Sequence, residues 1–315
     1  MAMPPQADSN PMVGVGLKCM SVVVFVGMQT MIKSVGHAVP AGEVSFFRSF
    51  FALVPVVIYL AWLGDLRSSL RTNDLPGHML RGFVGVGAMV LSFFSLASLP
   101  YPEWVSICYA APLLTVIFAA IFLKEVVRAY RWTAVIIGLA GVCVVTLPSL
   151  TIAEAGLGGM GAVGALAALG SAGFTAVAMI QIRRLAQHEK TATIVIYFSL
   201  TSSLISLLSS PFGWVLPTQG AALQLILAGL LGGIGQLLLT ASYRFADTST
   251  IAPFEYTSLI FAVLIGVFVF GEPLAWTTVV GGLIVVSAGI FIIWREHQLG
   301  IKRRKVRRAA SPTLS

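Results

Sequence analysis

Ten long apolar stretches, separated by short polar connections, run through the chain. Each comes close to the roughly 20 residues that a helix needs to cross a bilayer core about 30 Å thick. Helices suit this setting because they satisfy their own backbone groups inside lipid. We expect the spans to be Met12–Ile32, Ala41–Leu63, Gly82–Leu99, Trp104–Leu123, Trp132–Leu147, Leu157–Ile182, Thr191–Ser210, Ala221–Tyr243, Ile251–Phe270 and Trp276–Trp294.

The two halves of the chain share identical residues at a nearly constant separation. Gly82 matches Gly229 and Tyr109 matches Tyr256 at an offset of 147 residues, which becomes 144 beyond Glu125. Five spans separate equivalent points, and because five is odd, the second copy crosses the membrane in the opposite sense. Inverted repeats of this kind are typical of secondary transporters, whose site lies between the halves.

The sequence therefore predicts an all-α membrane protein with ten transmembrane helices in two inverted five-helix repeats. We expect an N-terminal tail over 1–11, a first repeat over 12–148, a second over 157–294 and a basic cytoplasmic tail over 295–315. The composition agrees, with 57% hydrophobic and 10% charged residues, whereas an ordinary soluble domain has about 25% charged residues.

Lysine and arginine predict the orientation. With the N-terminus in the cytoplasm, 17 of the 20 basic residues fall in cytoplasmic connections or the C-terminal tail, Arg81 among them. Only Lys33 falls outside, while Lys18 and Arg48 lie within spans. Positive residues favour the cytoplasmic side, so we expect both termini in the cytoplasm and the protein in the cell inner membrane.

Several kinds of chemistry are not indicated. The chain has no Gly-Lys dipeptide, so it lacks the lysine of a phosphate-binding loop. The four aspartates and four histidines lie in connections or tails, and the three cysteines lie singly in apolar runs. We therefore expect no catalytic residues, no metal and no cofactor, and we do not interpret the chain as an enzyme.

Two ionisable residues at membrane depth are candidate site residues, because such groups are costly unless paired or hydrated. Arg48 suits an anionic or carbonyl-bearing part of a substrate, or a structural ion pair with Glu43 or Glu103. Glu255 suits a cationic substrate or a coupling proton, or an ion pair with Lys18.

Uncharged polar residues extend this set. Tyr109 and Tyr256 lie close to Pro112 and Pro253, which we expect to interrupt the fourth and ninth helices; Pro55 is a third such proline. Tyrosine also forms interfacial belts, so the cavity role has an alternative. The predicted substrate-cavity residues are Arg48, Tyr109, Gln236, Tyr243, Glu255 and Tyr256, with Gln29 as a further candidate.

Other residues favour structural roles. Small residues let membrane helices pack closely, so we expect Gly229, Gly232 and Gly233 to form packing faces. Glu125 and Glu272 each follow a long apolar run and precede a short turn, and we interpret both as turn residues.

Two segments of the chain resemble a known family. YAAPLLTVIFAAIFLKE from Tyr109, with RWTAVIIGLAGVCVV, resembles the closing half of an EamA domain of the drug/metabolite transporter superfamily. FEYTSLIFAVLIGVFVFGE, with TTVVGGLIVVSAG, resembles it again. The resemblance implies two inverted repeats around a cavity lined by the first, third, fourth, sixth, eighth and ninth helices. Members of this family move small metabolites such as amino acids, nucleobases, S-adenosylmethionine and riboflavin.

We expect a secondary transporter that moves a small organic metabolite, such as riboflavin, S-adenosylmethionine or an amino-acid-like compound, by alternating access. A non-transporting membrane scaffold and a channel are the alternatives. The expected partners are the metabolite and the lipid bilayer, with no nucleic acid, and a homodimer is left open. The sequence does not specify the substrate, the direction or the coupling ion.

Overall fold

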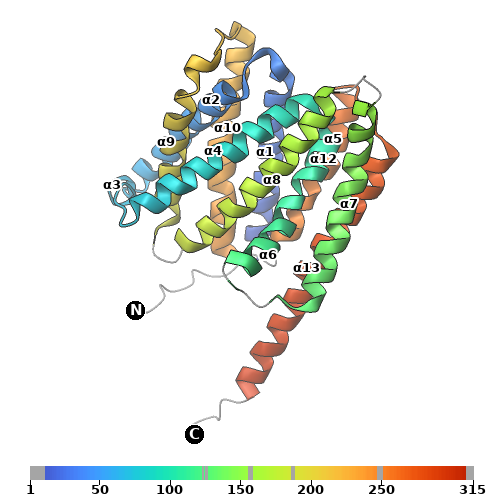
Figure 1. Ribbon diagram of the computed structural model, residues 1–315. Helices are drawn as coiled ribbons and strands as arrows, with labels where there is room; N and C mark the ends of the chain where they lie inside the picture. Colours follow the sequence, from blue (N-terminus) through green and yellow to red (C-terminus); the bar gives the residue numbers. More distant parts are fainter. Residues whose placement is uncertain are drawn as a thin grey trace.

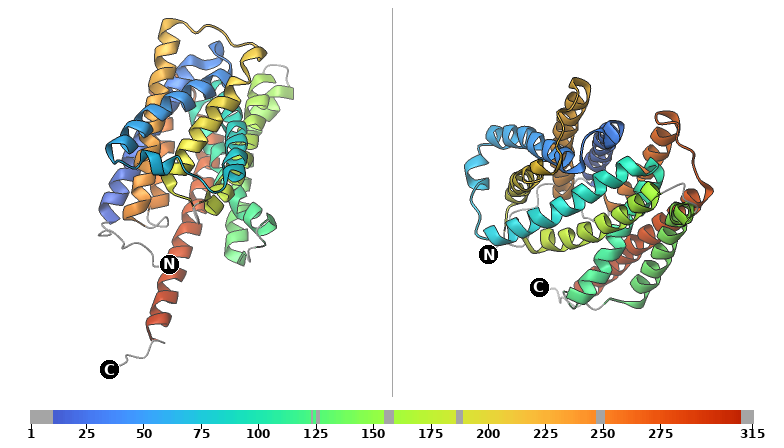
Figure 2. Two further views of the ribbon diagram at one scale, coloured as in Figure 1. Left: turned by 90° about the vertical axis from the view of Figure 1, so that its left-hand side faces the viewer. Right: turned by 45° about the horizontal axis from the view of Figure 1, so that its top comes forward.

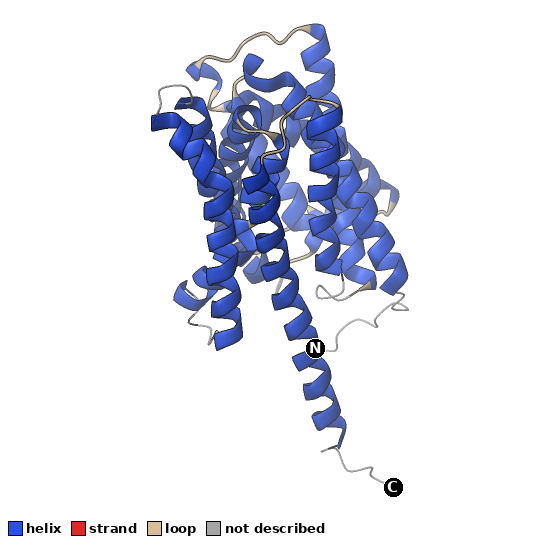
Figure 3. Ribbon diagram, turned by 90° about the vertical axis from the view of Figure 1, so that its right-hand side faces the viewer, coloured by secondary structure: helices blue, strands red, loops and turns tan. Residues whose placement is uncertain are grey.

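The computed structural model describes residues 11–122, 124, 127–154, 159–185, 189–246 and 251–309. Helices make up most of these residues, and no strand occurs among them (Figure 3). The prediction of an all-α protein is confirmed.

The helices form one bundle, and α13 extends past one end of it (Figure 1). The first half contains α1 (Pro11–Val35), η1 (Gly36–Ala38), α2 (Ala41–Trp62), α3 (Leu66–Ser69), α4 (Leu75–Ser98), α5 (Tyr101–Cys108), α6 (Ala110–Phe122) and α7 (Ala129–Glu154). The second half contains α8 (Gly159–Leu185), α9 (Thr191–Leu207), η2 (Ser210–Phe212), α10 (Gln219–Phe245), η3 (Ala252–Tyr256), α12 (Thr257–Phe268) and α13 (Trp276–Ala309).

Eight helical segments among the described residues are long and apolar enough to cross a membrane. They correspond to eight of the ten predicted spans. The other two predicted spans coincide with the shorter apolar helices Ala192–Leu207 and Pro253–Phe268. Helix α7 continues to Glu154 and is therefore longer than the predicted span Trp132–Leu147.

Helix α4 begins earlier than hydropathy predicts. Asp74 caps its first turn by accepting a hydrogen bond from the Gly77 backbone N at 2.9 Å, and Pro76 fits this turn because no donor is needed there. Arg81 consequently lies inside the helix. The prediction that Arg81 lies in a connection is wrong, because the apolar run that located the span begins only at Gly82.

Each main contact between a helix of one half and a helix of the other has a counterpart in which the roles of the two halves are swapped. α1 packs along α10, and α4 packs along α8 (Figure 2). α2 packs on α10, and α9 packs correspondingly on α4. α7 lies beside α13, and α2 packs on α9 (Figure 1). This pattern arises when α1, α2, α4 and α7 are equivalent to α8, α9, α10 and α13.

Glycines allow the close approach of paired helices. A Cβ on Gly229 of α10 would lie 2.8 Å from the carbonyl oxygen of Phe47 in α2. Where α7 crosses α13, a Cβ on Gly141 would lie 2.9 Å from the carbonyl oxygen of Gly281. Gly229 is therefore a packing residue, as predicted, and Gly141 and Gly281 act in the same way.

Two helices are interrupted at equivalent places. Tyr109 separates α5 from α6, because Pro112 has no N–H to continue the helical bonding. In the second half, Pro253 lies in the 3₁₀ turn η3, which ends at Tyr256 and leads into α12. These interruptions were predicted. Pro55, which was predicted to act similarly, lies within the continuous helix α2.

Candidate functional site

Tyr109 and Tyr256 meet at the two helix interruptions. Their ring centroids are 4.9 Å apart, and the rings pack edge to face at 65°. The Tyr109 hydroxyl lies 2.5 Å from Ser258 Oγ and donates to the Glu255 carbonyl oxygen at 3.3 Å. Two residues matched by the sequence repeat thus face each other between the halves, and Tyr109 belongs to the buried core.

Glu255 pairs with a lysine of α1. Lys18 Nζ lies 3.4 Å from Glu255 Oε2, and the exposed fraction is 4% for the lysine side chain and 56% for the glutamate side chain. The ion pair considered from the sequence is confirmed. It compensates the buried lysine, while the accessible carboxylate keeps surface with which a second cation or a proton can interact.

Arg48 does not form either of the ion pairs considered from the sequence. No described carboxylate lies within ion-pair distance of it, Glu43 and Glu103 included. Glu43 Oε2 instead accepts a hydrogen bond from the Val215 backbone N at 3.1 Å. The Arg48 guanidinium carbon lies 5.9 Å from the ring centroid of Phe198.

Sequence reasoning missed two residues beside Arg48. Arg81 of α4 also lies over the Phe198 ring, with its guanidinium carbon 4.1 Å from the centroid. The apolar pattern predicts a connection at Arg81, and a phenylalanine in an apolar run gives no polar signal. The structure also relates Phe198 to Arg48, because Arg48 is the eighth residue of α2 and Phe198 is the eighth residue of α9.

The remaining predicted residues lie on α1 and α10. Gln29 accepts a hydrogen bond from the Tyr101 hydroxyl at 2.9 Å. Gln236 is half-buried in α10, and the side chain of Tyr243 lies outside the described residues. The structure therefore brings Tyr109, Glu255 and Tyr256 together and places Arg48 in a second polar group.

Lys33 and Glu272 form an ion pair that sequence reasoning did not anticipate. Lys33 Nζ lies 2.8 Å from Glu272 Oε1, and the exposed fractions of the two side chains are 7% and 16%. Lys33 also donates to the carbonyl oxygens of Leu96 and Leu99, at 3.2 and 2.6 Å. Glu272 Oε2 accepts from the Tyr101 backbone N at 2.7 Å. We call this group the Lys33–Glu272 latch.

The latch ties together three separate parts of the bundle, namely the end of α1, the junction of α4 with α5, and the segment after α12. The prediction that Glu272 is only a turn residue is therefore incomplete, since its carboxylate holds long-range contacts. Its repeat partner Glu125 lies outside the described residues.

Glu189 connects polar segments at the opposite end of α4. It accepts hydrogen bonds from Thr72 Oγ1 at 2.7 Å and from the Asn73 backbone N at 2.9 Å. Burial on its own raises the pKa of Glu189, but these hydrogen bonds and the nearby His78 outweigh it and lower the pKa below its usual value of 4.5. Beside it, Lys190 pairs with Asp65 at 3.0 Å on the surface.

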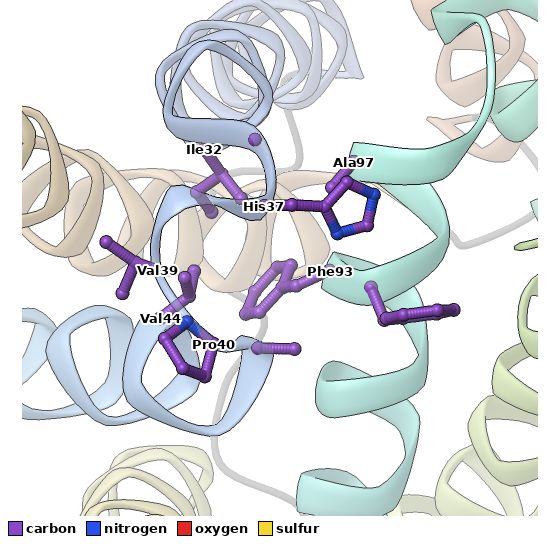
Figure 4. A pocket seen from close by; sticks show the side chains of 10 residues that line it. Ile32, His37, Val39, Pro40, Val44, Phe93 and Ala97 are labelled. Carbon is purple, nitrogen blue, oxygen red and sulfur yellow. The ribbon is translucent and has the colours of Figure 1, made fainter. Parts of the chain in front are cut away.

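A cavity of about 260 Å³ lies between the α1–α2 corner and α4 (Figure 4). Ile32, Val44 and Phe93 give it a mainly apolar wall, and His37 is the ionisable residue in its lining. The His37 Nε2 lies 3.2 Å from Ser98 Oγ. None of the six predicted cavity residues lines this space, so it is distinct from the polar groups described above.

Comparison with known proteins agrees with this architecture. The model of the EamA-like transporter family matches residues 12–147 and 162–295. The chain is 24% identical to an S-adenosylmethionine uptake transporter of Rickettsia bellii, covering 92% of this chain and 97% of that protein. It is 29% identical to a riboflavin transporter of Vibrio cholerae, covering 87% and 89%.

Two further similarities are informative. The chain is 28% identical to a pseudopaline exporter of Pseudomonas aeruginosa, covering 88% of this chain and 94% of the exporter. A solved crystal structure superposes with a TM-score of 0.64 at 20% identity, covering 90% of this chain and 97% of the other. The latter similarity shows the fold alone.

Proposed function

The chain belongs to the EamA-like transporter family, and we propose that it is a secondary transporter that moves one small organic metabolite by alternating access. In this proposal ten helices cross the membrane, and Ala192–Leu207 and Pro253–Phe268 provide the two shorter crossings. The inverted repeats comprise residues 12–148 and 157–294. The reciprocal helix contacts support this division.

The observation that carries the proposal is the meeting of Tyr109 and Tyr256 at two interrupted helices. Interrupted helices at equivalent positions of two inverted repeats characterise the substrate sites of secondary transporters. A channel needs a continuous pore, whereas this centre is filled by two packed rings. A scaffold would not require two matched interruptions at the same depth.

Two ion pairs mark the ends of the proposed path. Lys18 and Lys33 lie on the same helix, 15 residues apart, so their Cα atoms are separated by about 22 Å along α1. The Lys33–Glu272 latch closes one end of the path. The Lys18–Glu255 pair, with its accessible carboxylate, lies nearer the other end of the path. Opening the latch end requires that the Lys33–Glu272 pair separates.

We assign the substrate contacts to the residues that the sequence predicts, namely Arg48, Tyr109, Gln236, Tyr243, Glu255 and Tyr256. Glu255 also provides a site for a coupling proton. The relatives named for S-adenosylmethionine and riboflavin make these two metabolites the first candidates for this chain.

Counterflow in proteoliposomes tests the function. Vesicles loaded with unlabelled S-adenosylmethionine, riboflavin or mixed amino acids receive the labelled compound outside, with protein-free vesicles as the control. We expect saturable uptake of one compound and its acceleration by the same compound inside, which a carrier shows. Equal flux with and without internal substrate favours a channel. No flux of any metabolite through folded protein favours a scaffold.

We further propose that both termini face the cytoplasm of a bacterial inner membrane. The charge distribution of the chain supports this orientation. Cytoplasmic and periplasmic reporter fusions after residue 309 test it, and activity of the periplasmic reporter alone would contradict it.

A further inference from the structure

Two arginine side chains converge on one aromatic ring between α2, α4 and α9. The guanidinium carbons of Arg48 and Arg81 lie 5.9 and 4.1 Å from the ring centroid of Phe198. Arg48 is only 9% exposed. Within the described part of the chain, the buried Nε of each arginine and the buried Nη1 of Arg81 find no hydrogen-bond acceptor.

The described residues around the two arginines do not supply a counter-charge. Among the described residues, no carboxylate forms an ion pair with either arginine. Glu255 is paired with Lys18, 3.4 Å away. The face of Phe198 attracts each cation, but the two like charges repel each other. Ionised groups at membrane depth need a partner, and an uncompensated pair of this kind is typical of a binding site.

Glycines at matched positions of the repeats make room for this arrangement. A Cβ on Gly232 of α10 would lie 3.3 Å from Arg48 Nε. A Cβ on the matching Gly85 of α4 would collide with Arg81 Nη1 and with the Phe198 ring. The equivalent positions of α2 and α9, Arg48 and Phe198, therefore pack against equivalent glycines. The guanidinium groups are held by the fold rather than extended along its surface.

We propose that Arg48 and Arg81 bind an oxyanion of the transported molecule, either a carboxylate or a phosphate. The inference rests on the proposed transport function and specifies its substrate class. Guanidinium groups present planar sets of N–H donors that match the oxygens of both anions. Phe198 orients the two guanidinium groups, and the anion supplies the charge and the acceptors that the described residues do not.

Binding to matched probes tests the proposal in purified protein reconstituted in lipid nanodiscs. Riboflavin and riboflavin 5′-phosphate differ by a phosphate, and N-acetylmethionine amide and N-acetylmethionine differ by a carboxylate. We expect the anionic member of at least one pair to bind at least tenfold more tightly. Arg48→Gln and Arg81→Gln should each remove that preference, whereas Arg295→Gln, at an exposed position of α13, should preserve it.

Equal affinity within both probe pairs would overturn the inference, as would an anion preference that survives in both glutamine variants. If those variants do not fold, Gly232→Ala provides the test, because its Cβ would lie 3.3 Å from Arg48 Nε and 3.0 Å from Met28 Sδ, so that both side chains must shift slightly. We expect it to weaken anion binding several-fold. Gly173→Ala is its control, since nothing lies within 4 Å of a Cβ there, and an unchanged preference in Gly232→Ala contradicts the proposal.

Counterflow with the same probes separates this inference from the proposed function. Transport of neutral compounds without an anion preference refutes the oxyanion site and retains the transporter. Anion binding that depends on both arginines, in a protein that transports none of the probes or candidate metabolites, supports the site and refutes the transport function. The two probe pairs distinguish a phosphate from a carboxylate ligand.

Discussion

The Lys33–Glu272 latch leads to a quantitative prediction about opening. Glu272→Gln preserves the side-chain shape and removes the charge, so Lys33 keeps its two carbonyl acceptors and loses its counter-ion. Breaking a fully buried ion pair costs roughly 3–5 kcal/mol, whereas an exposed pair contributes about 0–1 kcal/mol. Because Glu272 is 16% exposed, we expect ~2 kcal/mol, which shifts the closed–open equilibrium roughly 30-fold.

Cysteine labelling measures this shift. A Gln29→Cys reporter lies one turn below Lys33 on α1, in a background without Cys19, Cys108 and Cys143. A membrane-impermeant thiol reagent applied from the latch side should label it roughly 30-fold faster in Glu272→Gln, if the labelling rate follows the open population.

An exposed ion pair provides the matched control. Asp65→Asn removes the carboxylate from the surface pair with Lys190 and should leave the labelling rate unchanged. Lys33→Gln should accelerate labelling by itself, and the two changes together should accelerate it less than the product of their separate effects, because both remove the same ion pair. Equal labelling of parent and Glu272→Gln in folded protein would refute the assignment of the latch as a closure.

Three further changes address stability and coupling. Glu189→Gln should lower the free energy of unfolding at pH 7 by about 1 kcal/mol. Because the pKa of Glu189 is lowered in the folded protein, this contribution is present above pH 4.5 and is lost as the pH falls through that pKa. An equal loss of stability at pH 3 contradicts this assignment. Gly281→Leu should destabilise the fold by roughly 1–3 kcal/mol in thermal unfolding, because its side chain enters the contact with Gly141, while Gly173→Leu in open space should have a small effect. Glu255→Gln should abolish the pH dependence of transport, and an unchanged pH profile would exclude this residue as the proton site.

The sequence specified much of the architecture because lipid restricts the options. Apolar length alone located the helices, and the offset between Tyr109 and Tyr256 identified two residues that meet in space. In the proposed inverted repeats a match at constant spacing carries three-dimensional information, since equivalent positions would lie symmetrically about the interface between the halves. The prolines added the positions of the interruptions.

The missed contacts have different physical causes. Lys33 and Glu272 are brought together by folding from opposite halves of the chain, and each has an ordinary structural interpretation at a helix end. Arg81 was placed outside its helix because Asp74 and Pro76 begin α4 before the apolar run. Phe198 gains its role from the cations over it, which its own residue type does not reveal.

The equivalence of Arg48 and Phe198 also bears on the resting state of such a protein. Two identical halves facing opposite ways would make the states open to each side equal in free energy, since exchanging the halves converts one state into the other. A position that holds a cation in one half and a benzene ring in the other breaks this degeneracy. Any preference for one resting state must therefore come from mismatched positions like this one and not from the motif that the halves share.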